Sequence, residues 1–150
     1  MTNGFKLIGI STRTTNKNNQ AATELQKLWG NFFAENILER IPNKQSNEIY
    51  AIYTDYKSDF TDEYTTIIGV PVSSLNDIPE GLIGREFEAQ NFQTFTAKGK
   101  MPDAVVATWM DIWKRDKELN RSYTYDLEIY GERSQDKNNP EVDIYIAVKS

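Results

Sequence analysis

The stretch YDLEIY, residues 125–130, has the pattern of a β-strand with a glutamate in its middle. Successive side chains of a strand point to opposite faces, so Leu127 and Ile129 share one face. Asp126 and Glu128 share the other face with the last tyrosine of the stretch. The predicted strand therefore has an apolar face and an acidic, aromatic face. The elements around it decide whether those carboxylates meet water or line a pocket.

The neighbours of this strand make up a strand-helix-strand-strand unit. A polar connection rich in turn formers, GERSQDKNNP, follows the stretch and leads into VDIYIAV, which has strand character. Upstream, DAVVATWMDIWKRD has apolar residues at helical spacing, and FQTFTAKGK alternates as a strand does. The predicted elements of this half are strands over 92–100, 123–130 and 142–148 and a helix over 103–116.

The same order of elements occurs earlier in the chain. An amphipathic helical segment contains LWGNFF, and its Trp29 lies 80 residues before Trp109 of the similar string TWMDIW. The predicted elements of this first half are strands over 5–13, 49–56 and 64–72 and a helix over 22–41. We therefore predict a single α+β domain over residues 1–150, built from duplicated βαββ units with pseudo-two-fold symmetry and an antiparallel sheet. The halves span about 5–73 and 88–149, joined by SSLNDIPEGLIGREFEAQ.

Composition excludes several kinds of chemistry. The 150 residues include no cysteine and no histidine, which removes disulfides, thiolate or imidazole metal sites and histidine-based nucleophile pairs. The glycine-containing segments lack the spacing of a phosphate-binding loop, and the acidic run TDYKSDFTDE lacks the pattern of an EF-hand. We expect no metal and no cofactor.

Charge and hydropathy limit the partners. The net charge of −5 opposes direct binding to nucleic acid and favours a cationic partner. No apolar run approaches the roughly 20 residues of a membrane-spanning helix, and the start of the chain lacks a secretory signal. The sequence thus predicts a soluble, cytoplasmic protein without a membrane partner.

Four strings together resemble a known family. They are FKLIGISTRT, LWGNFF, YAIYTDYKSDFTDEYTTIIGVPV and YDLEIYGE with NNPEVDIYIAV, in this order and over nearly the whole chain. The sequence is similar to the gyrase-inhibitor-like, or AraC-type, effector-binding domains, which occur within transcription regulators and as stand-alone proteins. The resemblance implies a groove between two βαββ halves that accepts small, often cationic and aromatic, ligands.

The resemblance also implies the centre of the site. A glutamate in a D-x-E-x-Y strand is the electrostatic centre of the family's groove, and the matching position here is Glu128 with Tyr130 beside it. Tyr145 and Tyr53 are candidate wall residues on neighbouring strands. One of Trp109 and Trp113 is expected to reach the groove, although tryptophans on such apolar stripes also serve as core.

Three functions remain open from the sequence. The favoured one is binding of cationic, aromatic or amphipathic small molecules for sensing or sequestration, with Glu128 as the charge partner. The second is hydrolysis of reactive small molecules, in which Glu128 activates water and Tyr130 donates a proton. The third is a protein-interaction role, such as inhibition of a gyrase-like target.

Overall fold

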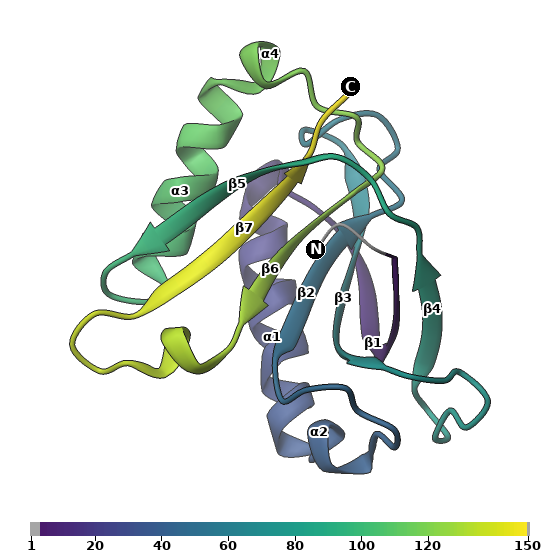
Figure 1. The fold of residues 1–150 in the computed structure, drawn as a ribbon. Helices are drawn as coiled ribbons and strands as arrows, with labels where there is room; N and C mark the ends of the chain where they lie inside the picture. The colour runs from purple at the N-terminus through teal and green to yellow at the C-terminus, as the bar shows by residue number, and fades with distance from the viewer. Residues whose placement is uncertain (1–3, 150) are drawn as a thin grey trace.

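One antiparallel sheet with two main helices on one face forms the molecule in the computed structural model, which describes residues 4–149 (Figure 1). The strands are β1 (Phe5–Thr15), β2 (Ile49–Thr54), β3 (Glu63–Val72), β4 (Ile83–Phe87), β5 (Phe92–Lys98), β6 (Tyr125–Tyr130) and β7 (Glu141–Ala147). The α-helices are α1 (Gln20–Ala34), α2 (Ile37–Arg40), α3 (Asp103–Lys114) and α4 (Asp116–Leu119). Short 3-10 turns, η1 (Lys17–Asn19) and η2 (Glu132–Gln135), complete the elements.

The strand order shows the duplication. Across the sheet the strands lie β4-β1-β3-β2-β6-β7-β5. Each half places its first strand outermost, its third strand in the middle and its second strand innermost, so β2 and β6 pair at the centre. The prediction of an α+β fold with two βαββ units and pseudo-two-fold symmetry is confirmed.

Two details differ from the prediction. The joining segment contains a strand, β4, which pairs with β1 at the edge of the sheet. Strand β4 has only five residues, too few to show a clear alternating pattern, so the sequence did not predict it. The first helix ends at Ala34 rather than continuing, because Asn36 adopts a left-handed backbone conformation with φ of 53° before α2 begins.

Helices α1 and α3 cover the same face of the sheet, one over each half (Figure 1). Under α1, Leu28 and Phe32 pack against Ile8 and Ile68 of β1 and β3. Under α3, Val105 and Ile112 pack against the outer strands of the second half. The two clusters leave the central pair β2 and β6 between the helices.

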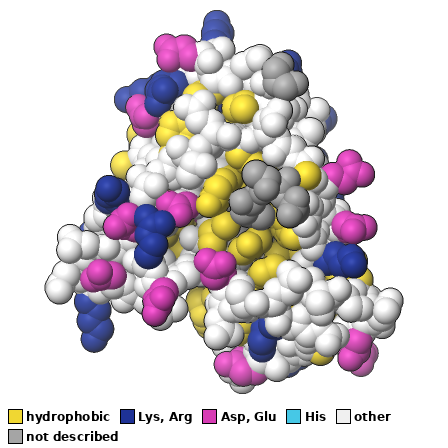
Figure 2. Space-filling model, in the orientation of Figure 1, with side chains coloured by type: hydrophobic (Ala, Val, Ile, Leu, Met, Phe, Trp, Pro, Cys, Tyr) yellow, Lys and Arg dark blue, Asp and Glu magenta, His cyan; other side chains and the backbone are white. Residues whose placement is uncertain are grey.

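The opposite face has its own apolar cluster. Figure 2 shows hydrophobic side chains gathered at the centre of the face in view, with charged side chains around them. Leu127 of β6 belongs to this cluster, as expected for the apolar side of the opening stretch. The buried members are Leu7, Tyr50, Ile52, Ile67, Phe87, Tyr125 and Leu127.

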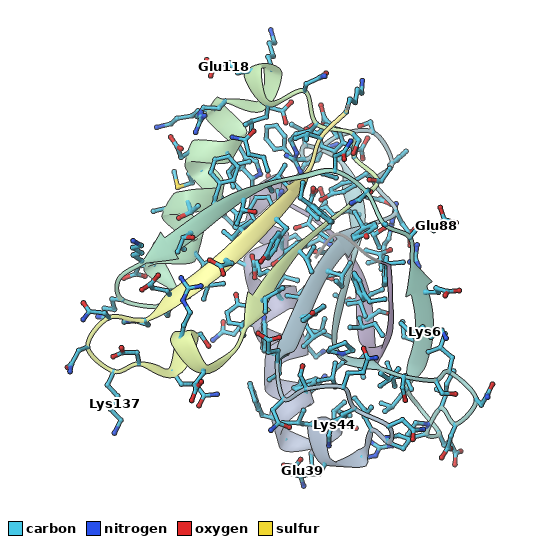
Figure 3. All side chains as sticks on the ribbon, in the orientation of Figure 1. Lys6, Glu39, Lys44, Glu88, Glu118 and Lys137 are labelled. Carbon is cyan, nitrogen blue, oxygen red and sulfur yellow. The ribbon has the colours of Figure 1, made fainter. Side chains whose placement is uncertain are left out.

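The charged side chains at the periphery project outward. Figure 3 shows this for its six labelled residues, Lys6, Glu39, Lys44, Glu88, Glu118 and Lys137. Within residues 4–149, no helix is both long enough and apolar enough to cross a membrane. Unlike these peripheral charged side chains, Asp126 and Glu128 of β6 are buried.

Asp126 is buried with its own cation. Its Oδ2 accepts hydrogen bonds from Arg121 Nη2 at 2.8 Å and from the Tyr56 hydroxyl at 2.5 Å, while its Oδ1 accepts from the Ala147 backbone N–H at 2.8 Å. The Arg121 side chain is itself buried, and its Nη1 lies 3.3 Å from Asp116. This network ties the segment before β6 to β6, β7 and the loop after β2.

The pair predicts a large loss of stability when its cation is removed. Arg121→Met leaves the Asp126 carboxylate buried without a countercharge, and we expect the free energy of unfolding to fall by about 3–5 kcal/mol. Urea unfolding followed by circular dichroism measures the change.

Two variants serve as controls. Arg85 forms a two-point ion pair with Asp55 on the surface, at 2.6 and 2.7 Å. Arg85→Met is expected to cost only about 0–1 kcal/mol, because water screens exposed pairs. Arg121→Met with Asp126→Asn should recover part of the loss. Equal, small losses for the two arginine variants would contradict a stabilising role of the buried pair.

Candidate ligand-binding site

Glu128 lies at the centre of the sheet on the face that the helices cover. In β6 it stands opposite Ala51 of β2 and Ile144 of β7. Its side chain is only 2% exposed, and neither of the residues opposite it carries a charge. An acidic group at such a position has to be held by hydrogen bonds or to lose its charge.

Three side chains donate hydrogen bonds to the Glu128 carboxylate. The Tyr53 hydroxyl donates to Oε2 at 3.0 Å and Trp109 Nε1 donates to the same oxygen at 2.5 Å. The Tyr130 hydroxyl donates to Oε1 at 2.5 Å. The donors come from β2, α3 and β6, so both halves of the chain hold the carboxylate.

The electrostatics of Glu128 follow from this arrangement. Burial raises the pKa of the carboxyl above its usual range, against the opposing effect of the three donors. Burial and the nearby carboxylate also raise the pKa values of Tyr53 and Tyr130, so both phenols stay protonated. Among the ion pairs of residues 4–149, none includes Glu128. Its charge is therefore held by neutral donors only, in contrast to that of Asp126.

Aromatic rings surround the carboxylate on both sides. On the α1 side, the Trp29 ring lies 5.0 Å from that of Tyr130, in an edge-to-face contact. On the α3 side, the Trp109 ring lies 5.4 Å from Tyr53 and 6.4 Å from Trp113. We call this set of rings the aromatic belt: Phe33, Trp29, Tyr130, Tyr53, Trp109, Trp113 and Phe60.

The ends of the belt differ. At one end Phe33 stacks on Trp29 and is 60% exposed. At the other end Phe60, from the loop between β2 and β3, stacks on Trp113 with centroids 5.4 Å apart and planes within 5°. The first-half loop thus reaches the second-half helix.

Most of the predicted site residues come together. Glu128, Tyr130, Tyr53 and Trp109 form one hydrogen-bonded group, and Trp113 touches it through Trp109. Tyr145 does not join them.

Tyr145 pairs with Leu127 rather than with Glu128, so it lies on the opposite face of the sheet, next to Phe92. The expectation that Tyr145 forms a wall of the same site is therefore wrong. The face that Tyr145 occupies depends on strand register, because a shift of one residue moves every side chain of a strand to the other face.

Three residues around the two buried acids were not predicted from the sequence. Trp29 is not among the predicted site residues, although its spacing from Trp109 indicates an equivalent place in the other half. Phe60 lies in the acidic run TDYKSDFTDE, where no pattern indicates a contact with Trp113. Nothing in the sequence pattern indicated that Arg121 would neutralise Asp126.

Two cavities lie away from Glu128. One of about 390 Å³ lies between α1, β1 and the residues before β4, and Leu28, Ile37 and Leu82 are among its lining. Another of about 430 Å³ lies beside Arg85 and Tyr125. The Glu128 carboxylate itself is covered by its three donors.

Within the described part of the chain, no three Asp or Glu side chains stand close enough to hold a metal ion. The donors on Glu128 are neutral hydroxyl and indole groups, and none of them brings a countercharge to the carboxylate.

Comparison with known proteins supports the resemblance found in the sequence. The chain is 29% identical to an integron cassette protein from the mobile metagenome of Vibrio cholerae, whose crystal structure superposes with a TM-score of 0.77 over 98% of this chain and 92% of that one. It is 24% identical to YobU of Bacillus subtilis (strain 168), named as a proposed transcriptional regulator, over 96% of this chain and 92% of the relative.

The fold is shared more widely. The structure of SAV2435 bound to tetraphenylphosphonium superposes with a TM-score of 0.80 at 18% identity, over 99% of this chain and 90% of that one. The sequence model of the integron-associated effector binding proteins matches residues 1–148. The expectation of an effector-binding domain is confirmed, and the chain belongs to the family of integron-associated effector binding proteins.

Proposed function

We propose that this protein binds lipophilic organic cations, with the Glu128 carboxylate as their countercharge and the aromatic belt as their apolar surroundings. The observation that carries the proposal is a carboxylate 2% exposed that no cation of the described chain neutralises. A bound cation would supply the missing charge and restore the ionised form that burial disfavours. Sensing or sequestration of such compounds is the role that follows.

The rings give the site its preference for apolar cations. Each aromatic face near a cation contributes roughly 0.5–2 kcal/mol, depending on how far water is excluded. Trp29 and Trp109 stand on either side of the carboxylate, one on each helix. SAV2435, which has the same fold, was solved with the aromatic cation tetraphenylphosphonium, and this likeness supports the ligand class.

The exposed apolar side chains of the helices support a route of entry. Phe33 on α1 and Val106 and Met110 on α3 are each at least half exposed. Phe33 stacks on Trp29, whose ring covers Tyr130. A hydrophobic ligand that first contacts Phe33 would replace the contact between Trp29 and Tyr130 and so reach Glu128.

The first test removes the charge of Glu128 and replaces one of its acceptor oxygens by an amide nitrogen, which cannot accept a hydrogen bond. Glu128→Gln keeps the shape of the side chain, and we expect affinity for tetraphenylphosphonium to fall by about 10-fold or more, since a desolvated charge pair is lost. Tryptophan fluorescence titration and calorimetry measure affinity, and mass spectrometry of the mixture tests whether the ligand is altered.

Glu39→Gln is the matched control, because Glu39 is exposed on α2 and its replacement makes the same change in net charge. Its affinity should equal that of the wild type. Equal affinity in Glu128→Gln would refute the role of Glu128, and turnover of the ligand would point to the hydrolase alternative.

The second test uses pH. Because burial raises the pKa of Glu128 in the free protein, protons compete with the cation at low pH. We expect affinity to fall as pH drops through that raised pKa, to reach a plateau above it, and binding near it to release up to about one proton. Calorimetry in buffers of different ionisation enthalpy counts the protons. Affinity that is constant down to the ordinary pKa of a glutamate would contradict this coupling.

A further inference from the structure

The Glu128 carboxylate has only one acceptor position left. An ionised carboxylate offers about four, two on each oxygen. Oε2 already accepts from Tyr53 and Trp109, while Oε1 accepts from Tyr130 alone. Oε2 is therefore filled, and Oε1 can take a single further donor.

The neighbouring carboxylate shows what a guanidinium does in such surroundings. Asp126 already accepts from Tyr56 and from the Ala147 backbone, and Arg121 reaches it through Nη2 alone. The Nη1 group of Arg121 turns to a second acid, Asp116. Its Nε–H is buried without a hydrogen-bond partner among the described residues. A guanidinium held by a carboxylate at one point thus needs a second acid for its other nitrogens, and even then one N–H of Arg121 stays without a partner.

We infer that the Glu128 site selects cations that carry at most one N–H, namely tertiary and quaternary ammonium compounds, over guanidinium and primary ammonium compounds with the same hydrocarbon group. This inference rests on the function proposed above. A two-point guanidinium bond needs one free position on each carboxylate oxygen, and Oε2 has none. Any N–H left over would be buried without a partner, which is costly.

The experiment compares two cations on the wild-type protein. The probes are a naphthylmethyl group attached to a dimethylammonium and the same group attached to a guanidinium, both charged at pH 8. We expect the tertiary ammonium to bind about 10-fold more tightly in calorimetry, as one unsatisfied buried N–H group would cause. The ratio of the two affinities is the readout, because changes in the charge of Glu128 affect both probes alike.

Three variants at the donors of Glu128, and a fourth at Trp113 as a control, then test the count of acceptor positions. Tyr53→Phe and Trp109→Phe each free one position on Oε2 and should reduce the preference to about twofold or less, since a two-point bond becomes available. Tyr130→Phe frees a position on Oε1 and leaves Oε2 filled, so the preference should persist. Trp113→Phe, which changes the belt without touching Glu128, should also keep it.

The two Oε2 variants check each other. Tyr53→Phe removes one oxygen atom and still reports if Trp109→Phe does not fold, as judged by circular dichroism. Equal affinity of the two probes for the wild type would overturn the inference and leave the proposed function standing. An equal loss of preference in Tyr130→Phe and Tyr53→Phe would also overturn it. If neither probe binds the wild type, the inference fails together with the proposed function.

Discussion

The structure depends on how two carboxylates are buried on one face of β6, a strand of the central pair. Asp126 and Glu128 stand two residues apart on β6, and both side chains lie beneath the helices. Asp126 is neutralised by Arg121, whereas Glu128 is held by two phenols and an indole. The donors come from β2, the loop after it, α3 and the segment before β6, so these two groups draw the halves of the chain together.

The pairing of the two halves places Glu128 opposite a small, uncharged side chain. Because β2 and β6 pair along the line between the halves, Ala51 lies directly opposite Glu128. An acid at position 51 would set two like charges about 5 Å apart, and one of them would have to be protonated. The small side chain of Ala51 avoids this and leaves space for the donors. The halves have thus come to contribute different chemistry: Tyr53 and Trp29 from the first, and Glu128, Tyr130 and Trp109 from the second.

The sequence predicts this fold well because its signals are local. Alternation in residues 125–130 correctly put Leu127 on one face and Glu128 with Tyr130 on the other. The site was harder, because it depends on contacts between distant segments. The face of Tyr145 follows from its pairing with Leu127, and the role of Phe60 follows from a loop that reaches α3. Neither contact produces a periodic pattern in the sequence. Strand β4 has only five residues, which are too few to show such a pattern.

If Glu128 is the countercharge of a bound cation, as proposed above, the choice of its donors matters. A lysine or arginine partner would stabilise the carboxylate more strongly, but it would also occupy the position of the incoming cation, as Arg121 does at Asp126. Hydroxyl and indole groups hold the carboxylate in place without cancelling its charge. The raised pKa of Glu128 is the consequence, since burial is only partly offset by these donors. A cation bound there would be attracted by a carboxylate charge that no side chain of the described residues neutralises. Because the carboxylate is already oriented, little free energy would be lost in ordering it.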